Sequence, residues 1–276
     1  MNLAAMKTFL VCVVSVLMSC SPGVCDNIVL VSGYNEAFNI FNISGEYNTL
    51  VVFFYLMKKV ACSDEGHVLQ LISNISVPDS LSWLDVSRTE SGDYEIFGIH
   101  ENTGHVSRMT LSTDLSRVTV DQTVKLPGGG PAHVLVDRDH GAVYVAHYGD
   151  GSWSHLELTG DSMIGEVVRH LQFPVSGLQC TSHAHQTVAR GGWVWIVDLG
   201  CDAVYTVRGD QVSGGDNAVT GVTMTPQGCG PRHIALHPSQ DIAALVCELK
   251  SLVIIYRSVA CKYFLVSQMK YLLGST

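Results

Sequence analysis

The chain has 276 residues, of which 47% are hydrophobic and 15% are charged, so it can bury a substantial core and is not a disordered chain. Its formal net charge of −9 argues against a nucleic-acid or anionic-membrane partner, because both require a basic surface. A small anionic substrate is still compatible with this charge, since a few local cations can hold one.

The first 25 residues have the organisation of a secretory signal peptide. Lys7 supplies a basic start, an apolar stretch of 11 residues follows over 8–18, and small residues come after it. This stretch is too short to cross a bilayer as a helix. We therefore expect cleavage near Cys25 and a secreted, extracellular protein. A lipid anchor, a membrane anchor, or a cytoplasmic protein whose N-terminus is misread are the alternatives.

Glycosylation and disulfide signals agree with secretion. Asn-Ile-Ser sequons begin at Asn42 and Asn74 and predict a glycoprotein. Three of the nine cysteines fall in or beside the signal, which leaves an even number that can form disulfides without specifying the pairs. The remaining cysteines are Cys62, Cys180, Cys201, Cys229, Cys247 and Cys261.

Four segments of the following sequence repeat with a period of about fifty residues. Aligned on the start of a short apolar strand, they give positions 50, 52 and 48 residues apart, namely Trp83, His133, His185 and His233. A second set of aligned positions is 47, 51 and 50 residues apart, namely His100, His147, Asp198 and Glu248. Two sets with one period make chance similarity a poor explanation.

Each repeat contains three short strands separated by turns. In the second repeat they are HVLVD over 133–137, AVYVAH over 142–147 and SWSHLEL over 152–158. Such a repeat is typical of the blades of a β-propeller. Residues 27–44 resemble the first strands of a further blade, so we expect an all-β propeller with about five blades.

A Gly-Pro turn precedes the first strand twice, in GGGPAH over 128–133 and GCGPRH over 228–233. The blade repeat alone explains the turn. First strands line the channel of a propeller, so we expect the aligned histidines 133, 185 and 233 to converge at one mouth, with Arg232 beside them.

Arg232 is not explained by the turn, because its aligned positions carry Ser82, Ala132 and Ala184. A guanidinium there requires a carboxylate, a substrate anion or a developing oxyanion. Glu248, on the next strand of the same blade, is the carboxylate candidate. A functional site and a structural Arg–Glu pair both remain open.

Together these motifs resemble the seven-bladed lactonase family, which includes propeller-type 6-phosphogluconolactonases and muconate-lactonizing cyclases. The resemblance covers residues 27–44 and 67–257. It implies lactone chemistry in the central channel without a cofactor or metal, and a small-molecule lactone as partner. The family's histidine, arginine and glutamate correspond to His183 or His185, Arg232 and Glu248, which we predict to be catalytic. The predicted substrate-binding residues are His133, His147, His233 and Asp198.

These residue types suit lactone hydrolysis in their own right. The reaction needs a base for water, which Glu248 or a neutral histidine can supply, and a cation for the oxyanion, which Arg232 can supply. Arg232 could instead anchor a phosphate or carboxylate of the substrate. In a secreted protein an unphosphorylated lactone is the better expectation, because phosphorylated sugar lactones are cytosolic.

Two stretches do not fit the repeat. Residues 46–66 interrupt the first blade, and residues 257–276 resemble neither a blade strand nor a linker, which gives a propeller domain over 26–256 with an atypical insert. Because the family closes with seven blades, we expect a truncated or mis-spliced sequence, or else a genuine short isoform that is inactive. Whether the chain is an enzyme, and its oligomeric state, stay open at this stage.

Two other functions compete with lactone hydrolysis. One is a non-catalytic, secreted propeller that acts as a binding module. The other is a zinc site formed by cysteines and histidines of two neighbouring blades, although their spacing matches no standard zinc motif. The zinc candidates are Cys180, His183, His185, Cys229 and His233. A disulfide between Cys180 and Cys229 is the preferred interpretation of these cysteines.

Overall fold

The computed structural model describes residues 13–21, 24–32, 37–43, 69–76, 81–175, 177–209, 218–237, 239–259 and 262–270. These residues form five antiparallel four-stranded sheets, in each of which the strands lie in chain order. They divide between Val124 and Lys125 into two compact units. Within the described residues, no helix is long and apolar enough to cross a membrane.

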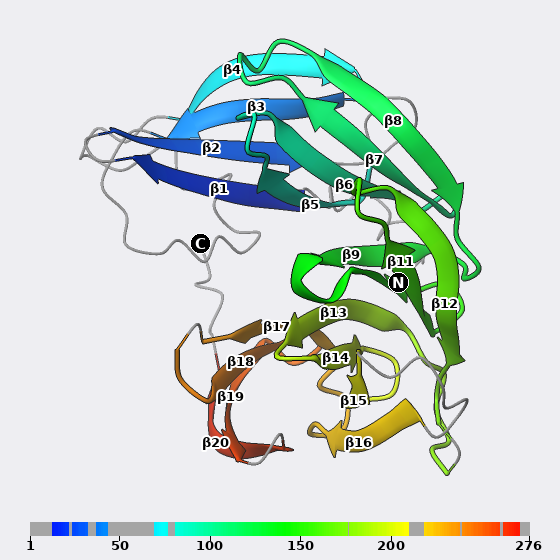
Figure 1. Cartoon of the computed structure of the whole chain (residues 1–276). Coiled ribbons are helices and arrows are strands. Elements are labelled where there is room, and N and C mark those ends of the chain that lie inside the picture. Colours follow the sequence, from blue (N-terminus) through cyan, green and yellow to red (C-terminus); the bar gives the residue numbers. More distant parts are fainter. Residues whose placement is uncertain are drawn as a thin grey trace, which may run out of the picture. The chain divides into compact units, whose positions relative to one another are not determined.

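The first unit contains two of the sheets (Figure 1). The strands of the first sheet are β1 (Val13–Ser21), β2 (Val24–Ser32), β3 (Ala37–Ile43) and β4 (Leu69–Ser76). The strands of the second sheet are β5 (Trp83–Arg88), β6 (Tyr94–His100), β7 (His105–Leu111) and β8 (Val118–Lys125). The first strands of the two sheets, β1 and β5, contact each other.

The second unit contains the other three sheets. The third sheet consists of β9 (Pro131–Asp137), β10 (Ala142–His147), β11 (Ser152–Leu158) and β12 (Ile164–Gln172). The fourth consists of β13 (Ala184–Arg190), β14 (Trp193–Asp198), β15 (Ala203–Arg208) and β16 (Val219–Met224). The fifth consists of β17 (Pro231–Leu236), β18 (Ile242–Cys247), β19 (Leu252–Val259) and β20 (Lys262–Lys270).

The first strands of these three sheets lie side by side. β13 contacts both β9 and β17, and Figure 1 shows the three together. Large apolar side chains fill the space between successive sheets: Trp153 and Tyr205 lie between the third and fourth, and Trp195 and Leu245 between the fourth and fifth. Burial on both faces explains why second strands such as AVYVAH are continuously apolar instead of alternating.

In the second to fifth sheets, the residue directly before the third strand has a left-handed backbone conformation, with a positive φ angle. These residues, with their φ angles, are Gly104 (69°), Gly151 (70°), Asp202 (50°) and Ser251 (48°). Their recurrence supplies a register for the repeat that does not depend on residue identity.

The structure bears on the predicted domain boundaries at three places. Residues 13–21, predicted to belong to a signal peptide, form β1 and pair with β2, and the signal itself stays a prediction. The predicted insert over 46–66 lies outside the described residues. The boundary at residue 256 is too early, since β20 pairs with β19 as a fourth strand. The segment KYFLVSQMK is rich in strand-forming residues, which explains why it continues the sheet.

Candidate functional site

The first strand of each sheet in the second unit begins with a bulge. One residue of the first strand is skipped in the pairing with the second strand: Ala132 in the third sheet, His185 in the fourth and Arg232 in the fifth. A bulge leaves one residue outside the ladder and redirects its side chain. His185 and Arg232 are therefore presented by the same local device on neighbouring strands.

This register corrects the first aligned set by one residue in the fourth sheet, and the second aligned set by one residue in the fifth, where Cys247 and not Glu248 is the counterpart of Asp198. His185 is the counterpart of Arg232, and Gln186 is the counterpart of His133 and His233. The amide of Tyr148 donates to Gly130 and that of Glu248 donates to Gly230, both at 2.8 Å, in the same way. Sequence comparison aligned the histidines because they are identical, although the bulge places them one position apart.

Three imidazole rings nevertheless converge at the start of these strands. The ring centroid of His233 lies 5.2 Å from that of His185 and 6.3 Å from that of His133. All three side chains are buried. The predicted convergence of the three histidines is therefore confirmed within this unit. Trp83, the aligned residue of the first unit, is the first residue of β5.

Burial keeps these rings neutral. It lowers the pKa of His133 and His185 well below the usual 6.5, and it lowers the pKa of His233 to about 3. The Arg232 charge lowers the pKa of His185 and His233 further. A neutral imidazole has one donor and one acceptor nitrogen, so these rings carry hydrogen-bonding groups without charge.

Arg232 and Glu248 form an ion pair beside the rings. Nη1 of Arg232 donates to Oε2 of Glu248 at 2.5 Å, and the side chains are 24% and 42% exposed. This contact uses one of the five N–H donors of the guanidinium, which leaves a donor edge for a ligand oxygen. The pair therefore combines a cation and an accessible carboxylate at one point.

His183, two residues before His185, packs against Tyr148. Their rings stack with centroids 4.5 Å apart, and Nδ1 of His183 donates to the Tyr148 carbonyl oxygen at 2.8 Å. The Tyr148 ring meets His185 edge-on at 5.9 Å. Sequence reasoning missed Tyr148 as a site residue. Tyr148 occupies the position in the third sheet that Glu248 occupies in the fifth, and only the corrected register shows this equivalence.

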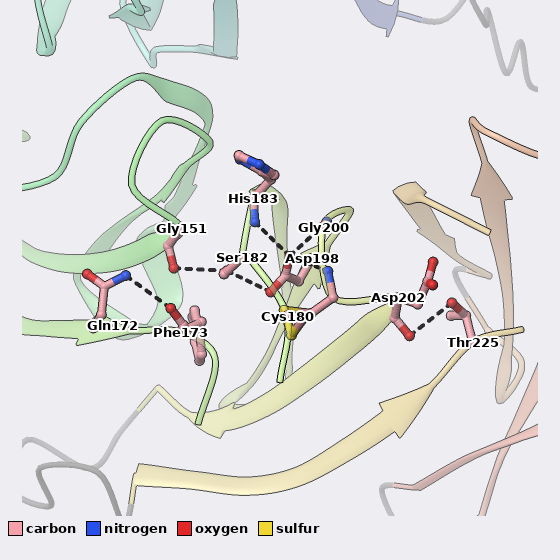
Figure 2. The surroundings of a disulfide bond; sticks show 11 residues. Gly151, Gln172, Phe173, Cys180, Ser182, His183, Asp198, Gly200, Asp202 and Thr225 are labelled. Carbon is pink, nitrogen blue, oxygen red and sulfur yellow. Dashed lines mark hydrogen bonds between the residues drawn. A yellow bond between two sulfur atoms is a disulfide. The ribbon is translucent and has the colours of Figure 1, made fainter. Parts of the chain in front are cut away.

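Asp198 joins several segments at the start of the fourth sheet by hydrogen bonds (Figure 2). Its carboxylate is completely buried and accepts from the Ser182 hydroxyl at 2.6 Å and from the His183 amide at 2.8 Å. It also accepts from the amides of Gly200 and Cys201 at 3.0 and 3.2 Å. These donors occupy both of its oxygens, which gives Asp198 a positioning role, and its substrate-binding role stays a prediction.

His147 is also completely buried and hydrogen-bonded within its own sheet. Its Nε2 lies 2.8 Å from the Ser154 hydroxyl oxygen, which lies 3.0 Å from Nδ1 of His170. Burial lowers the pKa of His147 to about 4. His100 and Ser107 are joined in the same way at 2.8 Å. The ring of His147 is thus directed toward Ser154, and its substrate-binding role stays a prediction.

The cysteines pair differently from the prediction. Cys180 is bonded to Cys201 and Cys229 to Cys247, so the predicted Cys180–Cys229 disulfide is wrong. Each bond closes within one sheet, whereas the sequence argument joined neighbouring sheets. In the part of the chain that the structure describes, no group of three or more His, Cys, Asp or Glu is arranged to hold a metal ion. The zinc hypothesis thereby loses both of its cysteine ligands.

The buried histidines predict that stability falls in mild acid. Below pH 6.5 the histidines are protonated in the unfolded chain but stay neutral in the folded protein. The free energy of unfolding therefore decreases by up to about 1.4 kcal/mol for each histidine per unit fall in pH. For His233 this stabilisation is complete above pH 6.5 and is lost as the pH falls toward its folded pKa of about 3. Urea unfolding at pH 7.5, 6.0 and 5.0 measures the slope.

Two variants test the origin of that slope. His233→Gln should reduce it, and His105→Gln, at the partly exposed first residue of β7, should leave it unchanged. A slope that is the same in wild type and His233→Gln would contradict the assignment.

The sheets of the second unit, with their first strands side by side and their bulge residues gathered at one end, are those of an all-β propeller protein. More particularly, residues 56–270 match the family described as lactonase, 7-bladed beta-propeller. The chain belongs to this seven-bladed lactonase family.

Curated relatives include two 6-phosphogluconolactonases. The one from Bacillus subtilis is 28% identical over 156 residues, which is 55% of this chain and 44% of that protein. The one from Pectobacterium atrosepticum is 29% identical over 143 residues, which is 51% of this chain and 41% of that protein. The chain thus spans less than half the length of either relative in these matches.

Solved structures show the same fold. The periplasmic gluconolactonase of Pseudomonas aeruginosa superposes with a TM-score of 0.70 at 17% identity, over 90% of this chain and 69% of that one. A structure described as a putative 6-phosphogluconolactonase from Bacteroides fragilis gives 0.69 at 17% identity, over 91% and 69% of the two chains. At these identities the similarity concerns the fold alone.

Proposed function

We propose that this protein hydrolyses a sugar-type lactone at the Arg232–Glu248 pair, with His185 and His183 completing the catalytic site. The observation that carries the proposal is the ion pair itself, held 2.5 Å apart beside buried neutral imidazoles. The names of the curated relatives support the reaction class.

Each residue has a defined task in this reaction. Glu248 accepts a proton from water as the water oxygen bonds to the lactone carbonyl carbon. The free N–H donors of Arg232 stabilise the oxyanion of the tetrahedral intermediate. When the intermediate collapses, the bond from the carbonyl carbon to the ring oxygen breaks, and the proton held by Glu248 passes to that oxygen. The product is the open hydroxy acid.

The histidines bind and orient the substrate in this scheme. His185 is presented by a bulge next to the one that presents Arg232, and His233 and His133 lie within ring-contact distance along the same strand starts. Because all three rings are neutral, they hydrogen-bond hydroxyl groups without adding charge. His183 supports His185 through the stacked ring of Tyr148.

The charge of the described part of the site favours an unphosphorylated lactone. Glu248 offsets the charge of Arg232, and burial keeps the imidazoles uncharged, so these groups supply no net positive charge to a phosphate. A secreted location agrees with this preference, and two disulfides suit an oxidising compartment. We therefore propose a neutral sugar lactone as the substrate of a secreted enzyme.

The experiment compares ring opening of D-glucono-1,5-lactone and of its 6-phosphate, after subtraction of spontaneous hydrolysis. We expect turnover of the uncharged lactone with the higher kcat/KM, and a loss of about 100-fold or more in Glu248→Gln. Glu157→Gln, an exposed position at the far end of β11, is the matched control. If wild type shows no turnover but binds the lactone, the alternative of a non-catalytic binding propeller replaces this proposal.

A further inference from the structure

The corrected register places a cross-link at the same point of two neighbouring sheets. We call the residues just before each first strand the leading turn: 181–183 in the fourth sheet and 228–230 in the fifth. In this register Cys229 is the counterpart of Ser182, and Cys247 is the counterpart of Asp198. The fourth sheet joins these positions by a hydrogen bond of 2.6 Å, and the fifth joins them by a disulfide.

The disulfide connects the two segments that carry Arg232 and Glu248. Cys229 is three residues before Arg232, and Cys247 directly precedes Glu248. Both cysteines are fully buried. The Asp202 carboxylate also accepts from the amides of the leading turn at Gly228 and Gly230, but it contacts neither Cys247 nor Glu248 in these bonds. Two backbone hydrogen bonds also join the turn to the strand end, from the Glu248 amide to Gly230 at 2.8 Å and from the Leu249 amide to Cys229 at 3.1 Å, and the disulfide adds a covalent side-chain link between the same segments.

The second disulfide has a different setting. Cys180–Cys201 joins the residue just before the leading turn of the fourth sheet to the segment after its second strand. There the buried Asp198 carboxylate already holds both segments, because it accepts from Ser182 on one side and from Cys201 on the other. Loss of this disulfide leaves its sheet with an intact polar cross-link.

We propose that the Cys229–Cys247 disulfide positions the Arg232–Glu248 pair, and that the Ser–Asp hydrogen bond of the neighbouring sheet can replace it. Its effect on turnover rests on the proposed function, whereas its effect on the order of the two segments does not. The disulfide touches no substrate and acts through the two residues that do.

The two disulfides provide an internally controlled test. They close loops of similar length, with sequence separations of 21 and 18 residues, so their removal should lower the thermal midpoint to a similar extent. In Cys229→Ala/Cys247→Ala we expect kcat for the lactone to fall by about 100-fold, because misplacement of a catalytic group by 1 Å has effects of that size. In Cys180→Ala/Cys201→Ala we expect kcat within about threefold of wild type.

The rescue variant is Cys229→Ser/Cys247→Asp, which copies the neighbouring sheet. This variant should recover most of the lost kcat, and its kcat should not change when a reductant is added. Equal losses of kcat in the two alanine pairs would overturn the proposal, and so would a rescue variant that folds without regaining kcat. If the rescue variant does not fold, the comparison of the two alanine pairs decides.

Amide hydrogen exchange over residues 228–234 and 247–250 separates this inference from the proposed function. Faster exchange there in the Cys229→Ala/Cys247→Ala variant, but not in the other pair, supports positioning even if wild type has no lactone turnover. Unchanged exchange over these segments would overturn the inference whatever the activity.

Discussion

Replacing Arg232 with alanine is expected to lower kcat for lactone hydrolysis by about 100- to 1000-fold, which is the usual effect of removing one oxyanion donor. The fold should survive, because the side chain is 24% exposed and its partner Glu248 is 42% exposed and can be solvated. Steady-state kinetics with D-glucono-1,5-lactone, with circular dichroism as a check on folding, measures the effect.

The matched control is Arg138→Ala, an exposed arginine at the opposite end of β9. It should retain full activity. Arg232→Lys separates the two roles open to Arg232: it keeps the charge but loses the planar donor fork, so kcat should recover only in part. A large rise in KM with unchanged kcat would instead mean that Arg232 anchors the substrate in the ground state.

The second large effect is expected at Asp198, and it concerns stability. Asp198→Ala removes the acceptor of one hydroxyl and three amides in a completely buried position. Leaving such donors unsatisfied should cost about 3 kcal/mol or more of the free energy of unfolding. Denaturant unfolding followed by tryptophan fluorescence measures this loss.

Asp139→Ala is the control, because Asp139 is exposed in the short helical turn after β9 and should change stability by less than about 0.5 kcal/mol. Asp198→Asn keeps one acceptor oxygen and should lie between wild type and Asp198→Ala. A loss at Asp198 no larger than at Asp139 would contradict the structural role.

The fold could be predicted from the sequence because period and composition act together. Short strands such as HVLVD and AVYVAH have counterparts about fifty residues further along the chain. This recurrence defines a blade repeat without any reference to side-chain contacts. The β20 strand was missed because an outer strand has no repeated motif, and it is recognised only by its pairing with β19.

The site was predicted less completely, for a geometric reason. Arg232 and Glu248 were found because an ion pair is visible as two residue types at a fixed spacing. The hydrogen bonds of His147 and Asp198 could not be predicted, because sequence shows which sheet end a residue occupies but not where its side chain is directed. The bulge that makes His185 the counterpart of Arg232 is a property of strand pairing, and identical residues at neighbouring positions conceal it.

The left-handed residue before each third strand has a consequence for how this chain tolerates change. Gly151 adopts that conformation freely, whereas Asp202 and Ser251 are held in it at a cost of about 1 kcal/mol each. The pairing of the flanking strands therefore determines the backbone conformation of this turn, whichever residue occupies it. At Asp202 the carboxylate offsets part of this cost, because it accepts hydrogen bonds from the leading turn of the fifth sheet. Ser251→Gly should remove this strain and raise the free energy of unfolding, and it should leave the proposed site unchanged.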